Sequence, residues 1–214
     1  MSAGIRFQPG DRLLLATHNR GKVKEFRELL APFELDVVSA GDLGLPEPEE
    51  TGSTYEENAR LKARAAADAS GFPSLADDSG LDVDILGGKP GIHTARWAGP
   101  SRDFAAAMRR VEDAIQAAGA SGPADRRGSF NATLCLALPG AGDMIFTGRA
   151  EGTLVWPPRG DLGFGFDPVF MPDGHDRTFG EMPSAMKHSW SPGHVGLSHR
   201  ARAFARFVEA CCEF

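Results

Sequence analysis

The sequence lacks several features that would each assign it to a class of protein. Its three cysteines are odd in number and none has the Cys-x-x-Cys spacing of a zinc site, which favours a reducing, cytoplasmic setting. It has no apolar run long enough to cross a bilayer and no basic region leading into one at the N-terminus. It has no repeat of fixed period, so solenoids and propellers are excluded. We therefore expect a cytoplasmic protein without membrane contact, in which residues 1–214 form a single domain.

Positive charge is also in deficit. Lys and Arg number 23 against 29 Asp and Glu, which gives a formal net charge of −6. Binding along a nucleic-acid backbone needs Lys and Arg clustered over a whole face, so this balance argues against nucleic acid as a partner. A small anionic substrate is compatible with it, provided that the fold gathers a few cations locally.

Carboxylates are concentrated in one segment, 74–91, around which the rest of the chain is organised. Asp77 and Asp78 are followed by Asp82 and Asp84, which alternate with apolar residues in the period of two that is typical of a strand. Adjacent Asp side chains at a strand end are costly unless something positive lies between them. Mg²⁺ is the usual reason, because it takes one or two protein carboxylates together with substrate phosphates. The alternative is a solvated Asp-Ser-Gly turn, since all three residue types favour turns.

A second segment has the pattern of an anion-binding loop. A short apolar strand over 12–17 ends in a polar turn that contains glycine, and a helix follows directly. On this helix Phe26 and Leu29 lie on the apolar face, whereas Glu25 is expected outside. Free backbone N–H groups at the helix start would point at an anion, and Lys22 adds a full charge. The Walker A pattern is absent, so an ordinary strand-to-helix turn is the alternative.

The next helix has both a start and a stop signal. Ser53 and the following Thr, with Glu57 three residues later, form a capping box, and the Ala-rich segment that follows ends at Ser70 before a glycine. Asn58 and Lys62 lie four residues apart and therefore share one face of this helix. Their simplest interpretation is a solvent-facing polar pair.

The remaining elements alternate between helix and strand. Segment 90–97 reads as a loop or an extended piece, and Ser101 is predicted to cap a helix that ends at Gly119. Segments 130–138 and 144–155 read as two strands of a hairpin, in which Cys135 is a small apolar filler. This alternation predicts an α/β fold with a mixed sheet.

Segment 159–172 combines glycines with aromatic residues. Glycine allows the backbone to approach something flat closely, and Phe164 and Phe166 would supply stacking faces, so a nucleobase would suit this slot. The alternative is a surface loop whose Phe side chains fill the core.

The last helix is expected to begin after Ser198. His199 and Arg200 would then occupy its first turn, where basic side chains are electrostatically unfavourable. This position hints at an anionic ligand that compensates them.

Together these motifs resemble the inosine/xanthosine triphosphate pyrophosphatases, which hydrolyse non-standard purine nucleoside triphosphates to the monophosphate and pyrophosphate. The resemblance runs nearly end to end and preserves the family's order. Its blocks are Thr17-His18-Asn19-Arg20-Gly21-Lys22 with Glu25, Glu50-Thr51-Gly52, Glu57-Asn58-Ala59 with Lys62-Ala63, Ala76-Asp77-Asp78-Ser79-Gly80-Leu81, Pro90-Gly91-Ile92 with Ala95-Arg96, Gly163-Phe164-Gly165-Phe166-Asp167-Pro168, and Ser198-His199-Arg200. The resemblance implies a twisted central sheet flanked by helices, two lobes around a substrate groove, and a homodimer.

The resemblance also implies a role for each matching residue. It places Mg²⁺ on Glu50 and Asp78, the catalytic base on Asp78, and Asp77 in the same acidic cluster. The implied substrate-binding residues are Thr17, His18, Asn19, Arg20, Gly21 and Lys22 for the phosphates, Phe164, Gly165, Phe166 and Asp167 for the base, and Lys62, Ser79, Lys187, His199 and Arg200 for further contacts.

Two departures from the family pattern qualify this assignment. Phe166 stands where the family usually has Tyr, so a hydroxyl contact is lost although stacking survives. Lys187 is separated from His199 by an insertion around 189–193. Two other functions stay open: a non-catalytic nucleotide sensor, against which the doubled Asp argues, and a pyrophosphatase for modified pyrimidine nucleotides.

Overall fold

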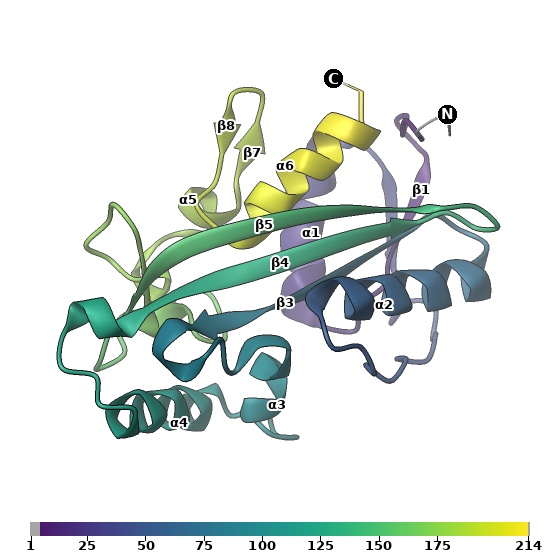
Figure 1. Cartoon of the computed structure of the whole chain (residues 1–214). Helices are drawn as coiled ribbons and strands as arrows, with labels where there is room; N and C mark the ends of the chain where they lie inside the picture. Colours follow the sequence, from purple (N-terminus) through teal and green to yellow (C-terminus); the bar gives the residue numbers. More distant parts are fainter. Residues whose placement is uncertain (1–4, 214) are drawn as a thin grey trace. The chain divides into compact units, whose positions relative to one another are not determined.

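The structure, a computed structural model, describes residues 5–213 and contains a six-stranded sheet of order β2-β1-β3-β4-β5-β6 (Figure 1). The strands are β1 (Arg12–Leu15), β2 (Asp36–Ser39), β3 (Ser74–Val83), β4 (Arg127–Ala137), β5 (Asp143–Leu154) and β6 (Phe170–Pro172), with a separate hairpin of β7 (Trp190–Ser191) and β8 (His194–Val195). Strand β1 pairs in parallel with β2 and β3, whereas β5 and β6 are antiparallel. The prediction of an α/β fold with a mixed sheet is therefore confirmed.

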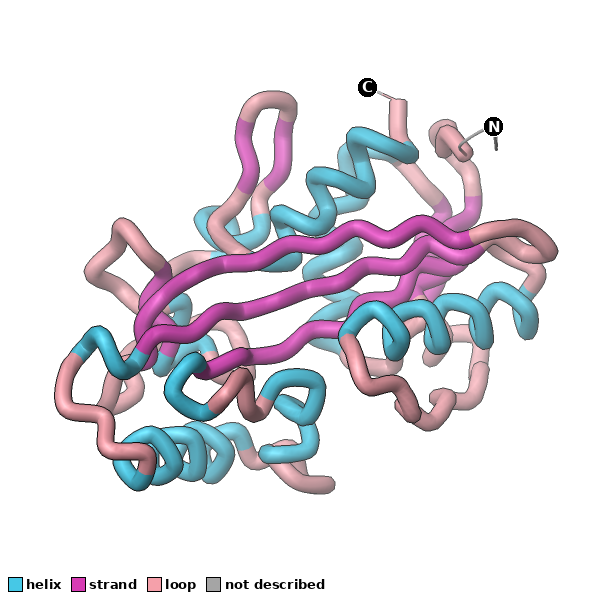
Figure 2. The backbone as a smooth tube through the Cα atoms, viewed as in Figure 1, coloured by secondary structure: helices cyan, strands magenta, loops and turns pink. Residues whose placement is uncertain are grey.

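Helices connect most of these strands (Figure 2). Those of the described chain are α1 (Arg20–Leu30), α2 (Tyr55–Ser70), α3 (Thr94–Trp97), α4 (Phe104–Ala117), α5 (Ser184–His188) and α6 (His199–Cys211). None of the described helices is long and apolar enough to cross a membrane. The capping box of α2 forms as predicted: the N–H of Glu57 donates to Thr54 at 3.1 Å, and the N–H of Ser53 donates to the Glu57 carboxylate at 2.7 Å.

Two expectations about the middle of the chain were wrong. Segment 90–97 is helical rather than a loop or an extended piece, since it contains a 3₁₀ turn followed by the single turn of α3. Both turns are too short to show a hydrophobic period in the sequence. Helix α4 is capped by Asp103 rather than by Ser101. Arg102 has a left-handed backbone conformation, with φ at 53°, so the helix cannot begin before it.

The described chain divides into two compact units. The first holds the residues up to Asp78, Ala132–Gly148 and those from Arg200 onward, and the second holds Ser79–Asn131 and Arg149–His199. Strands β3, β4 and β5 each pass from one unit into the other. A single functional domain with a substrate groove stays a prediction.

In the first unit, α2 packs on the sheet through small side chains. Its buried positions recur three and four residues apart, at Ala59, Ala63, Ala66 and Ala67. They pack against a patch that comprises Leu14, Ala16, Ala76, Cys135 and Ala137. Cys135 is fully buried, as expected of an apolar filler. The small side chains bring the helix backbone close to the sheet.

The opposite face of the same strands is covered by larger side chains. Leu13 and Leu15 alternate with the residues that face α2 and therefore point the other way. Figure 1 shows α1 on the side of these strands that is opposite α2. The rings of Phe204 and Phe207 in α6 lie 5.8 Å apart and are fully buried in the same unit. Helices α1 and α6 thus both contribute large buried side chains to the first unit.

The second unit has its own aromatic core. Helix α4 contributes Met108, Val111 and Ile115 on one stripe, as its period predicts. They belong to one cluster with Phe130 of β4 and Phe170 of β6, whose ring centroids are 4.5 Å apart. Strands β4 and β5 are neighbours in the sheet, so the predicted hairpin is confirmed.

Candidate active site

Asp77 and Asp78 lie in the middle of β3, neither at a strand end nor in a turn. Consecutive strand residues point to opposite faces of a sheet, so the two side chains have different surroundings. Both are buried, and buried charges need partners. Each aspartate has a separate set of cations.

Asp77 is held by two cations of the first unit. Arg200 Nε donates to Asp77 Oδ2 at 2.7 Å, and Lys22 Nζ lies 3.4 Å from the same oxygen. Burial alone would raise the pKa of Asp77, but the charges of Arg200 and Lys22 together hold it well below its usual range. Asp77 is therefore a fixed negative charge.

Arg200 also bridges Asp77 to α1. Its Nη1 donates to Glu25 Oε2 at 2.5 Å. The expectation that Glu25 is exposed was wrong: it is 7% exposed because it pairs with this buried guanidinium. The spacing of three residues from Lys22 to Glu25 could have signalled it, since it puts both on the same side of the helix. For Arg200, the compensating anions at the start of α6 are protein carboxylates rather than the expected ligand.

Asp78 meets a different lysine. Lys62 Nζ donates to Asp78 Oδ1 and to Glu50 Oε1, at 2.7 Å in each case. Burial raises the pKa of Asp78 above its usual value. For Lys62, burial opposes the charge, but the two carboxylates together raise its pKa and keep it protonated. The predicted metal carboxylates thus share a cation that lies between them.

Two carboxylate oxygens of this cluster are unused. Asp77 Oδ1 and Asp78 Oδ2 are buried and accept no hydrogen bond from any residue in 5–213. Within the same residues, no group of three or more His, Cys, Asp and Glu side chains could hold a metal ion. A pair of carboxylates, Glu50 and Asp78, still fits Mg²⁺, which commonly takes one or two carboxylates and completes its shell with water and substrate phosphate.

Asn58 and Lys62 do not form a solvent-facing pair, and that expectation was wrong. Both are buried on the stripe of α2 that faces the sheet. Asn58 Oδ1 accepts a hydrogen bond from the N–H of Gly52 at 2.8 Å, which ties the loop carrying Glu50 to the helix. Helical spacing gave their common face, but the partners that bury them are distant in sequence.

The predicted phosphate loop leads into α1, and several of its amides are already bonded. Asn19 caps the helix, and its Oδ1 accepts from Gly21 N at 2.9 Å and from Lys22 N at 3.3 Å. The N–H of Asn19 itself donates to Thr17 Oγ1 at 3.2 Å. The expectation of free N–H groups was therefore wrong at these positions, because Thr17 and Asn19 satisfy them. The charged side chains that remain near the start of α1 are Arg20, which is exposed, and Lys22, which pairs with Asp77.

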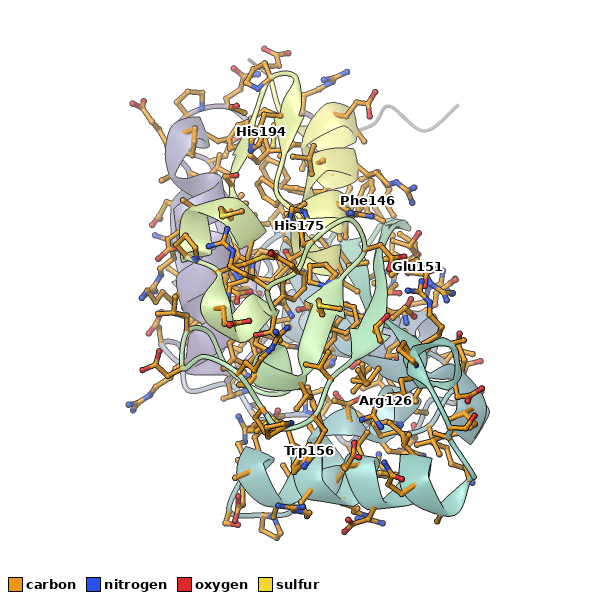
Figure 3. All side chains as sticks on the ribbon, turned by 90° about the vertical axis from the view of Figure 1, so that its left-hand side faces the viewer. Arg126, Phe146, Glu151, Trp156, His175 and His194 are labelled. Atoms are coloured by element: carbon orange, nitrogen blue, oxygen red, sulfur yellow. The ribbon has the colours of Figure 1, made fainter. Side chains whose placement is uncertain are left out.

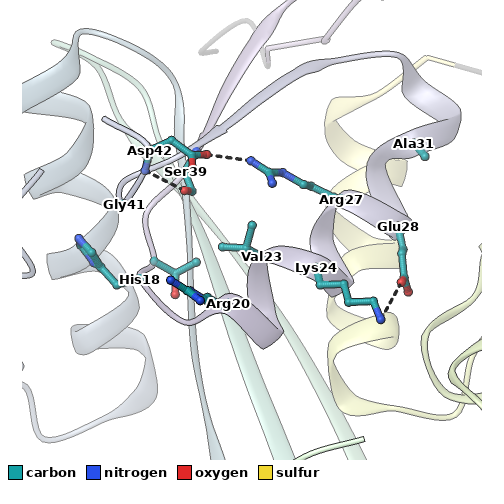
Figure 4. A pocket seen from close by; sticks show the side chains of 11 residues that line it. His18, Arg20, Val23, Lys24, Arg27, Glu28, Ala31, Ser39, Gly41 and Asp42 are labelled. Atoms are coloured by element: carbon teal, nitrogen blue, oxygen red, sulfur yellow. Dashed lines mark hydrogen bonds and ion pairs between the residues drawn. The ribbon is translucent and has the colours of Figure 1, made fainter. Parts of the chain in front are cut away.

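Thr17, His18 and Arg20 line a cavity of about 850 Å³ between α1 and the loop after β2 (Figure 4). The helix contributes residues such as Lys24 and Arg27, and the loop after β2 contributes Ser39, Gly41 and Asp42. Arg27 pairs with Asp42 at 2.8 Å. Asp77, Asp78 and Lys62 are not among the residues that line this cavity.

In the second unit, the predicted base-binding loop separates its two rings. Phe164 is 39% exposed, whereas Phe166 is 2% exposed and packs edge-to-face on Phe104 with 5.9 Å between centroids. Both interpretations of the segment are thus represented: Phe166 fills the core, and Phe164 is available for stacking.

Lys187 holds the same loop. Its Nζ donates to Asp167 Oδ2 and to the carbonyl of Phe179, at 2.9 Å in each case. Gly163 adjoins this pair with φ at +87°, and a Cβ there would lie 2.0 Å from Asp167 Oδ2 and 2.5 Å from Lys187 Nζ. Glycine is therefore favoured by the backbone angle, and any side chain there would have to displace the Asp167–Lys187 pair.

The insertion after Lys187 forms the β7–β8 hairpin, which returns the chain to its starting point. Gly196 N donates to Ser189 O at 2.7 Å, and Ser198 N donates to Lys187 O at 2.9 Å. The hairpin thus bulges out without separating Lys187 from Ser198. His199, which follows, stacks on Phe130 with 5.0 Å between ring centroids.

Comparisons with known proteins were consistent along the whole chain. The sequence model of the Ham1 family matches residues 13–210. The dITP/XTP pyrophosphatase of Mesorhizobium japonicum is 56% identical over 205 residues, covering 94% of this chain and 93% of that protein. That of Bradyrhizobium sp. is 56% identical over 213 residues and covers 100% of this chain and 99% of that protein. The structure of a HAM1 protein from Coxiella burnetii superposes with a TM-score of 0.80 at 34% identity, covering 93% of this chain and 97% of that one.

Proposed function

The chain belongs to the Ham1 family, and on this basis we propose that it hydrolyses the non-standard purine nucleoside triphosphates dITP, ITP and XTP to the monophosphate and pyrophosphate. Relatives named dITP/XTP pyrophosphatase are 56% identical to it over nearly their whole length. In the structure, the observation that supports this function best is the pair of buried aspartates, Asp77 and Asp78, each with its own cations. Hydrolysis of a phosphoanhydride needs both charge neutralisation and a base beside the attacked phosphorus.

Asp78 is the general base in this proposal. Its neighbour Asp77 has a depressed pKa whereas its own pKa is raised, and such divergence between adjacent carboxyls is typical of acid–base sites. Oδ2 of Asp78 accepts no hydrogen bond from residues 5–213, so it can orient a water molecule or take its proton. Asp77 keeps Lys22 and Arg200 in place.

Mg²⁺ is the proposed cofactor, with Glu50 and Asp78 as its protein ligands. When bound, it would neutralise charge on the triphosphate. The position of Lys62 supports this assignment. Its ammonium group lies 2.7 Å from an oxygen of each carboxylate, so the two carboxylates are close enough together to share one cation. Lys62 and Lys22 are the proposed phosphate-binding cations.

The nucleobase is assigned to residues of the second unit. Phe164 is the exposed ring and would stack on the purine, whereas Asp167 and Lys187 shape the loop behind it. A slot that pairs with a 6-keto group rejects a 6-amino group strongly, because the wrong group leaves buried partners unpaired. We expect ITP, dITP and XTP to be accepted and ATP to be a poor substrate.

A panel of nucleotides with pyrophosphate detection tests this function. Release of pyrophosphate from ITP, dITP and XTP at far higher kcat/KM than from ATP is the expected result. Binding of these nucleotides without turnover would instead identify a sensor, and a preference for modified pyrimidine nucleotides would identify the other enzyme class.

We further propose that the protein is cytoplasmic, as its cysteine content favours, and that it forms a homodimer, as the family resemblance implies. Trp156 lies beside α4 (Figure 3), with the guanidinium of Arg109 at 4.4 Å from its ring centroid, and Arg110 lies 4.4 Å from the ring of Trp97. Half-buried tryptophan paired with arginine is a common composition of interface anchors. A monomer mass by light scattering at micromolar concentration would contradict the dimer.

A further inference from the structure

Asn58 is a buried amide on an otherwise small and apolar stretch of α2. It is 1% exposed and begins the buried stripe that continues through Ala59, Lys62 and Ala63. A buried amide is retained only where its hydrogen bonds are made. Its side-chain oxygen Oδ1 accepts a hydrogen bond from Gly52 N at 2.8 Å.

The loop meets the helix too closely for any side chain at Gly52. A Cβ there would lie 2.6 Å from Asn58 Oδ1 and 2.7 Å from Glu57 Cβ, both shorter than real Cβ contacts. The backbone angle is not the reason, because Gly52 is not in the left-handed region. The glycine is therefore there for close approach, and the Asn58 amide is the surface that it approaches.

The same loop is held again one turn further along the helix. Glu50 Oε1 accepts from Lys62 Nζ at 2.7 Å, and Lys62 is four residues after Asn58. Two successive turns of α2 thus bind the loop of residues 50–52, one through the backbone of Gly52 and one through the side chain of Glu50. Loss of the first contact frees the backbone two residues from Glu50, so that holding its carboxylate against Lys62 costs more entropy.

We propose that Asn58 is a positioning residue that keeps Glu50 in place to receive the divalent cation. It acts through the backbone at Gly52 and does not itself touch metal or substrate. The inference rests on the proposed role of Glu50 as a metal ligand. Asparagine suits the position because it offers a neutral acceptor, whereas an aspartate would add a third negative charge near Glu50 and Asp78.

The test compares Asn58→Ala with Thr54→Ala. Thr54 is the N-cap of the same helix, and Thr54→Ala also removes one hydrogen bond from a backbone amide. Its side chain makes that bond to Glu57 rather than to Gly52. Binding of Mn²⁺ to the nucleotide-free protein, followed by electron paramagnetic resonance, is the first readout. The second is the Mg²⁺ concentration for half-maximal pyrophosphate release, and the third is the melting temperature. We expect Asn58→Ala to weaken Mn²⁺ binding about tenfold and to raise the Mg²⁺ requirement by the same factor, which corresponds to about 1.4 kcal/mol. Its kcat at saturating Mg²⁺ should stay within about twofold of the parent. Thr54→Ala should change the melting temperature alone.

A double-mutant cycle with Glu50→Gln separates this inference from the function beneath it. If Asn58 acts through Glu50, Asn58→Ala adds nothing to the loss of Mn²⁺ binding in Glu50→Gln. Additive losses, or an equal loss in Thr54→Ala, would overturn the positioning role. Unchanged Mn²⁺ binding in Glu50→Gln alone would instead refute the metal assignment. If Asn58→Ala does not fold, Gly52→Ala is the second variant, because its Cβ would push the loop away from Asn58. Mn²⁺ binding by Gly52→Ala as strong as in the parent would also overturn the inference.

Discussion

Adjacent residues in a strand can have opposite chemistry, and Asp77 and Asp78 show how. The pleat of β3 sends one side chain to Arg200 and Lys22 and the other to Lys62. The sequence predicts the pair and its alternation, but it favours a strand end because Asp is rare in strand interiors. Which lysine meets which aspartate depends on α1 and α2, so it could not be predicted from local spacing.

Asp78→Asn is expected to fold and to lose turnover. The amide keeps the shape but removes a metal-ligand charge and a base, so kcat/KM for ITP should fall by well over tenfold, which exceeds about 1.4 kcal/mol of barrier. Asp82→Asn on the same strand is the control, because that side chain accepts a bond from Asn131 and takes no part in the proposed chemistry. Activity of Asp78→Asn within tenfold of the parent would show that the carboxylate is not catalytic.

Arg200→Ala is expected to unfold the protein more readily. It would leave Asp77 and Glu25 buried without their shared cation, and breaking a buried ion pair on one side costs about 3 to 5 kcal/mol. Urea unfolding measures this loss, with Arg12→Ala, which breaks an exposed pair with Asp36, as the control. Parent-like stability together with a weakened preference for ITP over ATP would show that Arg200 serves the nucleotide instead.

Acidification should test the ion cluster around Asp77. The pKa of Asp77 in the folded protein lies below that of an unfolded chain, about 3.9. The stabilisation is therefore fully present above that pH and is lost as the pH falls toward the folded-state pKa. The difference in unfolding free energy between the parent and Asp77→Asn should shrink as the pH is lowered from about 5 to about 3. A difference that stays constant over this range would mean that the carboxylate does not keep a depressed pKa.

At the scale of elements, the long amphipathic segments were predictable and the short ones were not. Helix α2 is predicted by its capping box and by Gly71, which ends the helix with φ at 73°. Helix α3 and the 3₁₀ turns beside it have fewer residues than one hydrophobic period needs. The insertion after Lys187 was visible as a departure, but its closure into β7 and β8 depends on the backbone bond between Lys187 and Ser198.

Shortening the β7–β8 hairpin should leave the enzyme intact. Replacing 190–195 by two glycines keeps Ser189 and Gly196, whose backbones are already joined at 2.7 Å. The residues from 191 to 195 are exposed, and His194 lies on the projecting hairpin (Figure 3), so the buried surface lost is mainly that of the half-buried Trp190. We expect kcat/KM for ITP within about twofold of the parent and a melting temperature lower by only a few degrees. A large loss of activity would show that the hairpin serves the reaction.

At the scale of the whole molecule, the two units contain different kinds of predicted site residue. The first unit holds the acidic cluster with Lys22 and Lys62, and the second holds Phe164, Asp167 and Lys187. The motifs and their order along the chain predict which residues belong to the site. The sequence does not predict how these residues are divided between the two units. Strands β3, β4 and β5 each cross from one unit to the other, and in β3 the boundary falls between Asp78 and Ser79.

This division predicts that phosphate recognition and base recognition can be damaged separately. Lys62→Met and Lys187→Met are a matched pair, since each removes a buried ammonium that bonds to a carboxylate oxygen at 2.7 Å or 2.9 Å. Lys62→Met should lower kcat/KM for ITP and ATP by the same factor, because both nucleotides carry the same triphosphate. Lys187→Met should release Asp167 and the loop with Phe164, and so reduce the ratio of kcat/KM for ITP over ATP about tenfold or more. The same panel run on both variants decides between outcomes. If Lys62→Met changed the ratio and Lys187→Met did not, the assignment of phosphates to the first unit and of the base to the second would be reversed.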